Sequence, residues 1–236
     1  MWTLVLWDVD YTLLDCDGLG REAHEAAFAR VTGQPPDGLP FLGGRTDLGV
    51  LTGALRDHGF TPTPGLLAEA CAALSAEFAH RAPLLPGRGR VLAGVPAALA
   101  HLAADDHVVQ AVLTGNLRPI AELKLAAFGL DTHLDLDAGA YGDEDADRAK
   151  LVGLARERAA ARRGGEPAAT VVIGDTPNDI TAGRRGGAHT IGVATGRDTA
   201  GDLRAAGADA VLGDLTDLTA LLAALPRDPT DGALSS

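Results

Sequence analysis

The apolar run TLVLW at residues 3–7 leads directly into the segment DVDYTL at residues 8–13. An apolar run of this length is typical of a strand that is buried on both faces of a parallel sheet. Ligands of such sheets bind at the carboxyl ends of the strands, so we expect Asp8 and Asp10 to face the crevice. Alternation along the strand would turn both carboxylates to one side, where their repulsion favours a cation between them. Taken alone, the pair is equally compatible with a solvated turn.

Similar apolar runs recur along the chain, and alanine-rich stretches of helical character separate them. We expect further strands at 108–113, 169–173, 190–193 and 210–212, a weaker strand at 134–138, and helices at 95–104, 119–128, 148–162 and 179–186. This alternation predicts an α/β protein with a Rossmann-like, doubly wound parallel sheet.

Residues 17–82 interrupt the alternation. They contain helical segments at 21–31, 47–57 and 65–81, joined by loops rich in Pro and Gly, and no convincing strand. We therefore expect a core domain formed by residues 1–16 and 83–225, with a small helical domain inserted at 17–82. The polar segment 226–236 is expected to be a frayed tail.

Composition excludes several classes of function. The chain has 236 residues and a formal net charge of −12, which argues against binding to nucleic acids or to anionic membranes. Its apolar runs are shorter than a membrane span, and no basic segment precedes Asp8, so neither a membrane protein nor a secretory signal is expected. Cys16 and Cys71 are too few for a disulfide framework. We expect a cytoplasmic protein with reduced thiols.

A second acidic pair follows another predicted strand, in the segment IGDTPND at residues 173–179. Asp175 and Asp179 stand there beside a glycine that lets the backbone approach a ligand closely. Clusters of carboxylates suit hard cations, above all Mg²⁺. The simpler alternative is that an aspartate here caps the start of a helix.

Two further segments are less specific. LTGN at residues 113–116 places the Thr114 hydroxyl before a helix start, which is a good anion site but also an ordinary helix cap. A cation, Arg148 or Lys150, stands near the start of the helix at 148–162, where a solvated helix face is the usual interpretation.

In this order, the four segments resemble the four motifs of the haloacid dehalogenase-like superfamily, whose commonest members are phosphatases. FLGGRTD at residues 41–47 and the stretch 183–196 resemble the phosphoglycolate phosphatase-like branch. The resemblance implies a Mg²⁺-dependent phosphatase acting on a small phosphorylated metabolite, as a monomer or homodimer. One alternative is a sugar phosphomutase like β-phosphoglucomutase. Another is a catalytically idle binding or regulatory member, although the presence of all the motif carboxylates argues against this.

The resemblance also assigns catalytic roles. Asp8 matches the nucleophile that forms an aspartyl-phosphate, and Asp10 matches the general acid/base. The dehalogenases lack an aspartate at the place of Asp10, so its presence favours phosphoryl transfer. Thr114 matches the hydroxyl that binds the transferring group, with Gly115 and Asn116 following it at the substrate.

The implied metal ligands are Asp8, the backbone carbonyl of Asp10, and Asp175, while Asp179 holds the metal through water or orients the cation. The third motif departs from the family, which generally has lysine there, often before proline. Lys150 keeps the residue type, whereas Arg148 better matches the spacing to the apolar positions that follow.

Residues 17–82 correspond to the helical cap that closes over the site in this family. Arg45 is the candidate specificity residue, because the loop at Gly43 and Gly44 could aim it at the site; a surface arginine is the alternative. His24 has a weaker claim, since a histidine on a helix face is usually solvated. The segment contains no lysine, which argues against relatives that form a Schiff base there.

Overall fold

The protein is described by a computed structural model that covers residues 1–40 and 42–226. Most of the tail predicted at 226–236 lies outside the described residues. The elements are β1 Thr3–Trp7, β2 Leu14–Asp15, α1 Leu19–Thr32, α2 Asp47–Asp57, α3 Pro64–Arg81, η1 Ala82–Leu84, α4 Leu85–Arg88, β3 Arg90–Val91, α5 Val95–Ala103, β4 Val108–Val112, α6 Arg118–Ala127, η2 Asp131–His133, α7 Arg148–Arg163, β5 Ala169–Gly174, α8 Pro177–Arg185, β6 His189–Val193, α9 Ala200–Ala205, β7 Ala210–Leu212 and α10 Leu218–Ala224.

The main sheet is parallel and has the strand order β4-β1-β5-β6-β7. β1 lies inside it, pairing Thr3 with Val108 of β4 on one side and with Ala169 of β5 on the other. The chain thus winds outward from β1 in both directions, and in such sheets ligands bind at the carboxyl ends of the strands where the winding reverses. The expected doubly wound α/β architecture is confirmed.

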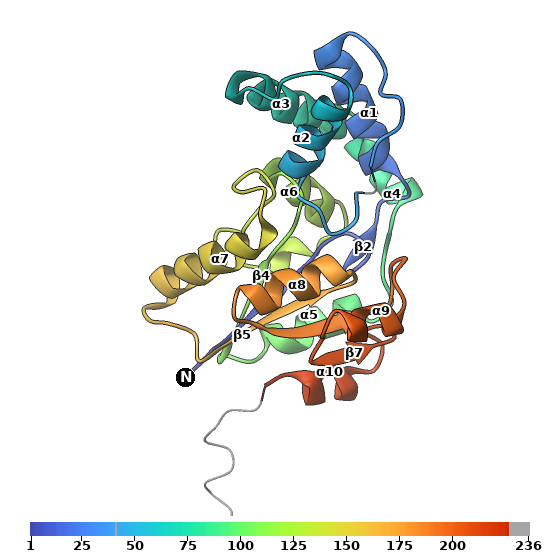
Figure 1. Cartoon of the computed structure of the whole chain (residues 1–236). Helices are drawn as coiled ribbons and strands as arrows, with labels where there is room; N and C mark the ends of the chain where they lie inside the picture. Colours follow the sequence, from blue (N-terminus) through green and yellow to red (C-terminus); the bar gives the residue numbers. More distant parts are fainter. Residues whose placement is uncertain (41, 227–236) are drawn as a thin grey trace, which may run out of the picture.

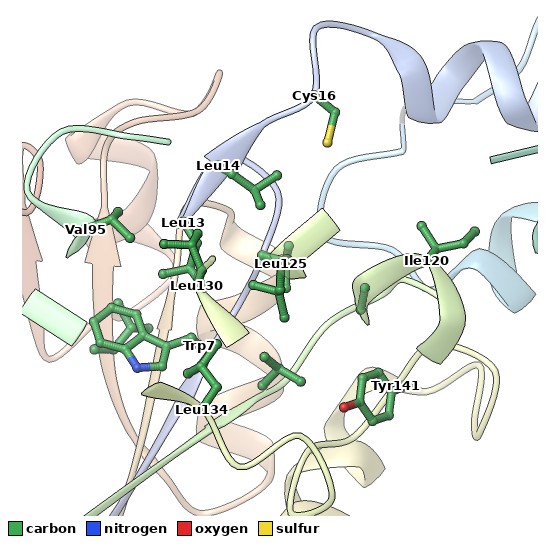
Figure 2. Close-up of a cluster of buried hydrophobic side chains, with 14 of the residues drawn as sticks. Trp7, Leu13, Leu14, Cys16, Val95, Ile120, Leu125, Leu130, Leu134 and Tyr141 are labelled. Atoms are coloured by element: carbon green, nitrogen blue, oxygen red, sulfur yellow. The ribbon is translucent and has the colours of Figure 1, made fainter. Parts of the chain in front are cut away.

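Helices cover both faces of this sheet (Figure 1). Leu4 and Leu6 of β1 pack in a cluster with residues of α7, whereas Val5 and Trp7 belong to a larger cluster with residues of α5 and α6. Figure 2 shows the labelled part of that larger cluster, with the Trp7 ring among leucine side chains. The indole N–H of buried Trp7 donates to Gln110 Oε1 at 3.1 Å. Because β1 is buried on both faces, its apolar run needs no polar alternation.

The weak strand predicted at residues 134–138 is wrong. A bend and a turn occupy these residues directly after the short helix η2, and the Tyr141 hydroxyl donates to Leu136 O in the turn. The segment contacts β4 through the apolar packing of Leu134 and Ala138 and through separate hydrogen bonds, one of them from Asp135 N to Gln110 O. Isolated bonds of this kind do not make a strand ladder.

Helices α1, α2 and α3 gather at one end of the molecule, away from most of the sheet (Figure 1). They share a small apolar cluster of their own around Phe28, Ala54 and Leu55. The chain leaves for these helices through β2 and returns through β3, and Leu14 pairs antiparallel with Val91 there. The two connections therefore lie side by side, although the domain boundaries at 17 and 82 remain a prediction. None of the helices in the described part of the chain has the length and apolar character to cross a bilayer.

Candidate active site

Asp8, directly after β1, forms a buried ion pair with Arg148. Arg148 is the first residue of α7, and its Nη2 lies 2.6 Å from Asp8 Oδ1. The same nitrogen lies 2.6 Å from Asp179 Oδ1 and donates to Leu113 O at 2.9 Å. Both side chains of the Asp8–Arg148 pair are 7% exposed. The N-terminus of α7 thus delivers one cation between two carboxylates.

Lys150, the alternative for the third-motif cation, lies elsewhere. Its side chain is 65% exposed and pairs with Asp145 Oδ2 at 2.8 Å on the surface. The reason is helical geometry: positions two apart on a helix point in different directions. Of the two cations, the structure brings only Arg148 to Asp8.

Asp8, Asp175 and Asp179 form a buried acidic cluster, in which one oxygen of each carboxylate lies within 4.8 Å of the others. Burial, and then the charge of Asp179, raises the pKa of Asp8, with Arg148 acting in the opposite direction. Burial, and then the charges of Asp179 and Asp8, raises the pKa of Asp175. Three carboxylates share the single charge of Arg148, so the cluster has an unbalanced negative charge.

The donor set fits a hard cation. Asp179 Oδ1 is a buried oxygen that accepts no hydrogen bond within the described residues, although Arg148 Nη2 lies nearby without hydrogen-bond geometry. Such a buried acceptor is costly unless another positive charge approaches it. Oxygen ligands from several carboxylates are the usual environment of Mg²⁺ and Ca²⁺.

Asp179 also serves the helix that carries it. α8 begins at Pro177, two residues earlier than expected, with Thr176 as its N-cap. Asp179 Oδ2 accepts from Thr176 N at 3.0 Å and from Thr176 Oγ1 at 2.6 Å, completing a capping box. The helix-start interpretation is therefore correct in part: Thr176 is the cap, and Asp179 supports it from the third helical position.

The carboxylate of Asp10 does not join this cluster, contrary to the expectation that both aspartates turn to one side. Tyr11 adopts a positive φ of 59°, and both Leu13 N and Leu14 N donate back to Val9 O, so the chain turns sharply after Asp10. Strand alternation stops applying at that turn. The side chain of Asp10 therefore does not take part in the acidic cluster. The backbone carbonyl of Asp10 is still expected as a metal ligand from the family resemblance.

Asp10 is held instead by Lys124, a residue that the sequence motifs did not single out. Lys124 Nζ lies 2.7 and 2.6 Å from the two Asp10 oxygens, and Asn116 Nδ2 donates to Asp10 Oδ2 at 2.7 Å. Burial raises the pKa of Asp10, but the Lys124 charge together with the hydrogen bonds from Lys124, Asn116 and Cys16 outweighs this and leaves the pKa lowered. The available signal was a lysine between two leucines in a predicted helix, in a chain that has lysine only at 124 and 150.

The loop after β4 is organised internally. Thr114 is fully buried, and its Oγ1 accepts from Asn116 N at 3.2 Å and from Asn116 Nδ2 at 2.7 Å. Neither side chain caps α6, which starts at Arg118 without a side-chain cap. Asn116 bonds to Asp10, Thr114 and Lys124, so its side chain supports the Asp10–Lys124 pair rather than standing free in the cavity.

The segment 43–48, which leads into α2, lies directly on the loops after β4 and β5. Asp47 N donates to Gly115 O at 2.7 Å, and Asp47 Oδ2 accepts from Leu117 N at 2.8 Å. Gly44 has φ +65°, and a Cβ there would come within 2.3 Å of Thr176 Oγ1. A Cβ on Gly115 would lie 1.9 Å from the Arg45 carbonyl oxygen. Glycine at 44 and 115 permits this close contact between the helical segment and the core.

Arg45 and His24 occupy different environments. The Arg45 guanidinium is exposed and lies beside Gly53 of α2. His24 is buried, so its expected solvation is wrong: Nδ1 lies 2.8 Å from Gly20 O and Nε2 lies 3.1 Å from Asp47 Oδ1. Burial lowers the pKa of His24, but the charge and hydrogen bond of Asp47 together with the Gly20 carbonyl outweigh this and leave the pKa raised. His24 thereby supports the carboxylate that docks on the loop at Gly115.

A cavity of about 260 Å³ connects these groups. Its lining includes the acidic and basic groups of the core and, from the helical segment, Arg21, His24 and Arg45. Arg197, from the loop after β6, also reaches it. The cavity thus joins Asp8 and Asp10 with a basic rim.

Residues 5–184 match the family model of the haloacid dehalogenase-like hydrolases. The chain belongs to this family. It is 28% identical over 223 residues to validoxylamine A 7'-phosphate phosphatase of Streptomyces hygroscopicus subsp. limoneus, covering 92% of this chain and 96% of that one. The match confirms the family resemblance and the expectation of a hydrolase, and the relative's name agrees with the phosphatase class.

Solved structures share the fold. A predicted phosphatase from Clostridium acetobutylicum superposes with a TM-score of 0.71 at 19% identity, covering 95% of this chain and 100% of that one. CbbY from Rhodobacter sphaeroides in complex with phosphate gives a TM-score of 0.68 at 22% identity, with 92% and 96% covered. The helical segment at 17–82 is therefore included in the shared architecture.

Proposed function

We propose that the protein is a Mg²⁺-dependent phosphatase that hydrolyses a small phosphorylated metabolite through an aspartyl-phosphate on Asp8. The observation that carries the proposal is that the two aspartates of the first motif have separate cationic partners. Asp8 pairs with Arg148 in the acidic cluster, and Asp10 pairs with Lys124 at the cavity. Two carboxylates in different environments are suited to different tasks.

The chemistry follows from these positions. Asp8, oriented through Oδ1 by Arg148, attacks phosphorus while the bond from phosphorus to the ester oxygen breaks. Asp10 gives its proton to the departing oxygen, then takes one from the water that attacks the aspartyl-phosphate. Water and the phosphate ester thus become alcohol and inorganic phosphate, and Asp8 is restored. Thr114 and Arg148 supply donors for the phosphoryl oxygens.

Asp8, Asp175 and the Asp10 carbonyl would hold Mg²⁺, with Asp179 behind them. When bound, the ion neutralises charge on the phosphoryl group and on the carboxylates. Binding of the phosphate without a metal ion is less consistent with this cluster, because three carboxylates face one guanidinium.

Mg²⁺ should raise the melting temperature of the substrate-free protein. At an ion concentration of about 100 Kd, binding to the folded state adds about 2.7 kcal/mol to the free energy of unfolding, or about 5–10 °C for a chain of this size. Asp175→Asn should lose this increase, yet melt higher than wild type without metal because it relieves like-charge repulsion. Differential scanning fluorimetry with Na⁺ as the ionic-strength control measures both. An equal Mg²⁺ shift in Asp175→Asn would contradict the site.

The substrate is proposed to be a small phosphate monoester. The cavity, at about 260 Å³, lies near the lower end of the volumes of small-molecule sites. The similarity to a validoxylamine A 7'-phosphate phosphatase supports a phosphorylated small molecule rather than a phosphoprotein. We expect the arginines at the cavity rim, Arg21, Arg45 and Arg197, to favour anionic esters.

The proposal is tested with p-nitrophenyl phosphate, with Mg²⁺ and with EDTA. We expect nitrophenol release that requires the metal, followed by identification of the natural ester from a metabolite panel that includes validoxylamine A 7'-phosphate. Glucose 1-phosphate is assayed for its products: free phosphate indicates a phosphatase, whereas isomerised sugar phosphate indicates a mutase. Metal-independent release, or none from any ester, would refute the proposal.

A further inference from the structure

Lys124 is a buried cation that pairs with Asp10, whereas Arg148 pairs with Asp8 and Asp179. It lies in α6, its side chain is 3% exposed, and its ammonium has three acceptors: both Asp10 oxygens and Asn116 Oδ1, the last at 2.7 Å. An ammonium has three protons to donate, so these contacts use its full capacity. The Phe78 ring of α3 lies against it, with the ring centroid 5.3 Å from Nζ.

The Asp10 carboxylate is confined by these partners. Two of its contacts come from Lys124 and one from Asn116, and Cys16 Sγ approaches Oδ1 at 3.8 Å. Even so, the Asp10 side chain is 35% exposed and lines the cavity. Of the four lone pairs of the carboxylate, Lys124 and Asn116 occupy three, and the fourth, on Oδ1, faces only the weak donor Cys16, which a proton would displace.

The backbone around Lys124 and Asn116 is held in place by Asp47. Asp47 accepts from Leu117 N, the residue before α6, and its own N–H donates to Gly115 O. The loop that carries Asn116 and the start of the helix that carries Lys124 are therefore both bonded to one residue of the helical segment. A group held by such a network stays in one orientation.

We propose that Lys124 is a positioning residue: with Asn116, it fixes the Asp10 carboxylate in the orientation from which it protonates the leaving oxygen. This inference rests on the proposed function. In this role Lys124 acts through the Asp10 carboxylate and not on the ester itself. In its absence Asp10 keeps its carboxyl group, with a higher pKa, but has no fixed direction toward the ester.

The experiment compares Lys124→Met with Lys150→Met, which removes the exposed lysine of α7. kcat/KM is measured for aryl phosphates whose phenols range from strongly acidic to weakly acidic, and for an alkyl phosphate. A leaving group that is stable as an anion needs no proton, so 2,4-dinitrophenyl phosphate should lose only a few-fold in Lys124→Met. Phenyl and alkyl phosphates should lose about 10²–10³-fold, within the range of acid catalysis. Lys150→Met should match wild type throughout.

A purely structural role would reduce all esters equally, and this outcome would overturn the inference. The second test is the pair Asp10→Asn and Asp10→Asn/Lys124→Met: if Lys124 acts through Asp10, the double variant should be no slower than the single one. Additive losses would also overturn it.

If Lys124→Met fails to fold, Lys124→Arg is used instead; it keeps the charge but displaces the carboxylate, and should show the same dependence on leaving group. Wild-type inactivity on every ester would refute the proposed function, whereas an active wild type with uniform losses refutes only the role of Lys124.

Discussion

Asp8→Asn should abolish the hydrolysis of aryl phosphates, with kcat falling by about 10⁴-fold or more, as expected for loss of a nucleophile. The amide keeps the size of the carboxylate, but it cannot form an acyl phosphate. The measurement is nitrophenol release under saturating Mg²⁺, together with trapping of acid-stable phosphoenzyme, which should appear in wild type only.

Asp57→Asn provides the matched control, because Asp57 is an exposed aspartate at the end of α2. It should retain wild-type kcat. The physical state of the Asp8 variant is checked by its melting temperature, which should not fall, since one of three clustered negative charges has been removed. Wild-type activity in Asp8→Asn would exclude the aspartyl-phosphate mechanism.

Arg148→Ala should have large effects on both activity and stability. Arg148 is buried between Asp8 and Asp179, so its removal leaves two neighbouring carboxylates without their cation. Breaking a buried pair from one side costs about 3–5 kcal/mol of the free energy of unfolding. The loss of a donor to the phosphoryl group should lower kcat/KM by about 10²–10³-fold. Urea unfolding without metal and steady-state kinetics with Mg²⁺ measure the two effects.

Lys150→Ala is the control for Arg148→Ala, because Lys150 is the other candidate for the third-motif cation. Its surface pair with Asp145 should contribute little, so kcat/KM and the unfolding midpoint should remain near wild type. Arg148→Lys should recover only part of the loss, since an ammonium cannot reproduce the fork of the guanidinium. If both alanine variants were mild, the assignment of the third-motif cation to Arg148 would be wrong.

The core of the fold was largely predictable. The run at residues 3–7 becomes β1 with the same bounds, and the runs beginning at 108, 169 and 210 become strands at those positions. Continuous apolar runs are a reliable signal where both faces of a strand are buried. The failure at 134–138 concerns a segment at the edge of β4, where apolar residues pack without a strand ladder.

The residues of the candidate site were largely predictable, but the ion pairs and hydrogen bonds between them were not. The sequence predicted Asp8, Asp10, Asp175 and Asp179 together, because all follow strands that end at the same edge of the sheet, and the structure clusters three of them without Asp10. The partner of Asp10 was out of reach, since Lys124 is 114 positions away and belongs to no motif. The choice between Arg148 and Lys150 depended on which direction each side chain takes from the first turn of α7.

The sequence by itself therefore determined the α/β class, the order of the strands along the chain and the carboxylates at their ends. Those features depend on local composition and on the rule that parallel strands end at one edge. Only the tertiary structure decided which cation neutralises which carboxylate. It also decided that Asp47, paired with His24, hydrogen-bonds to the loop at Gly115. These contacts join residues far apart in the chain across distances of about 3 Å. Such contacts depend on packing and on backbone turns like that at Tyr11, which leave no periodic pattern in the sequence.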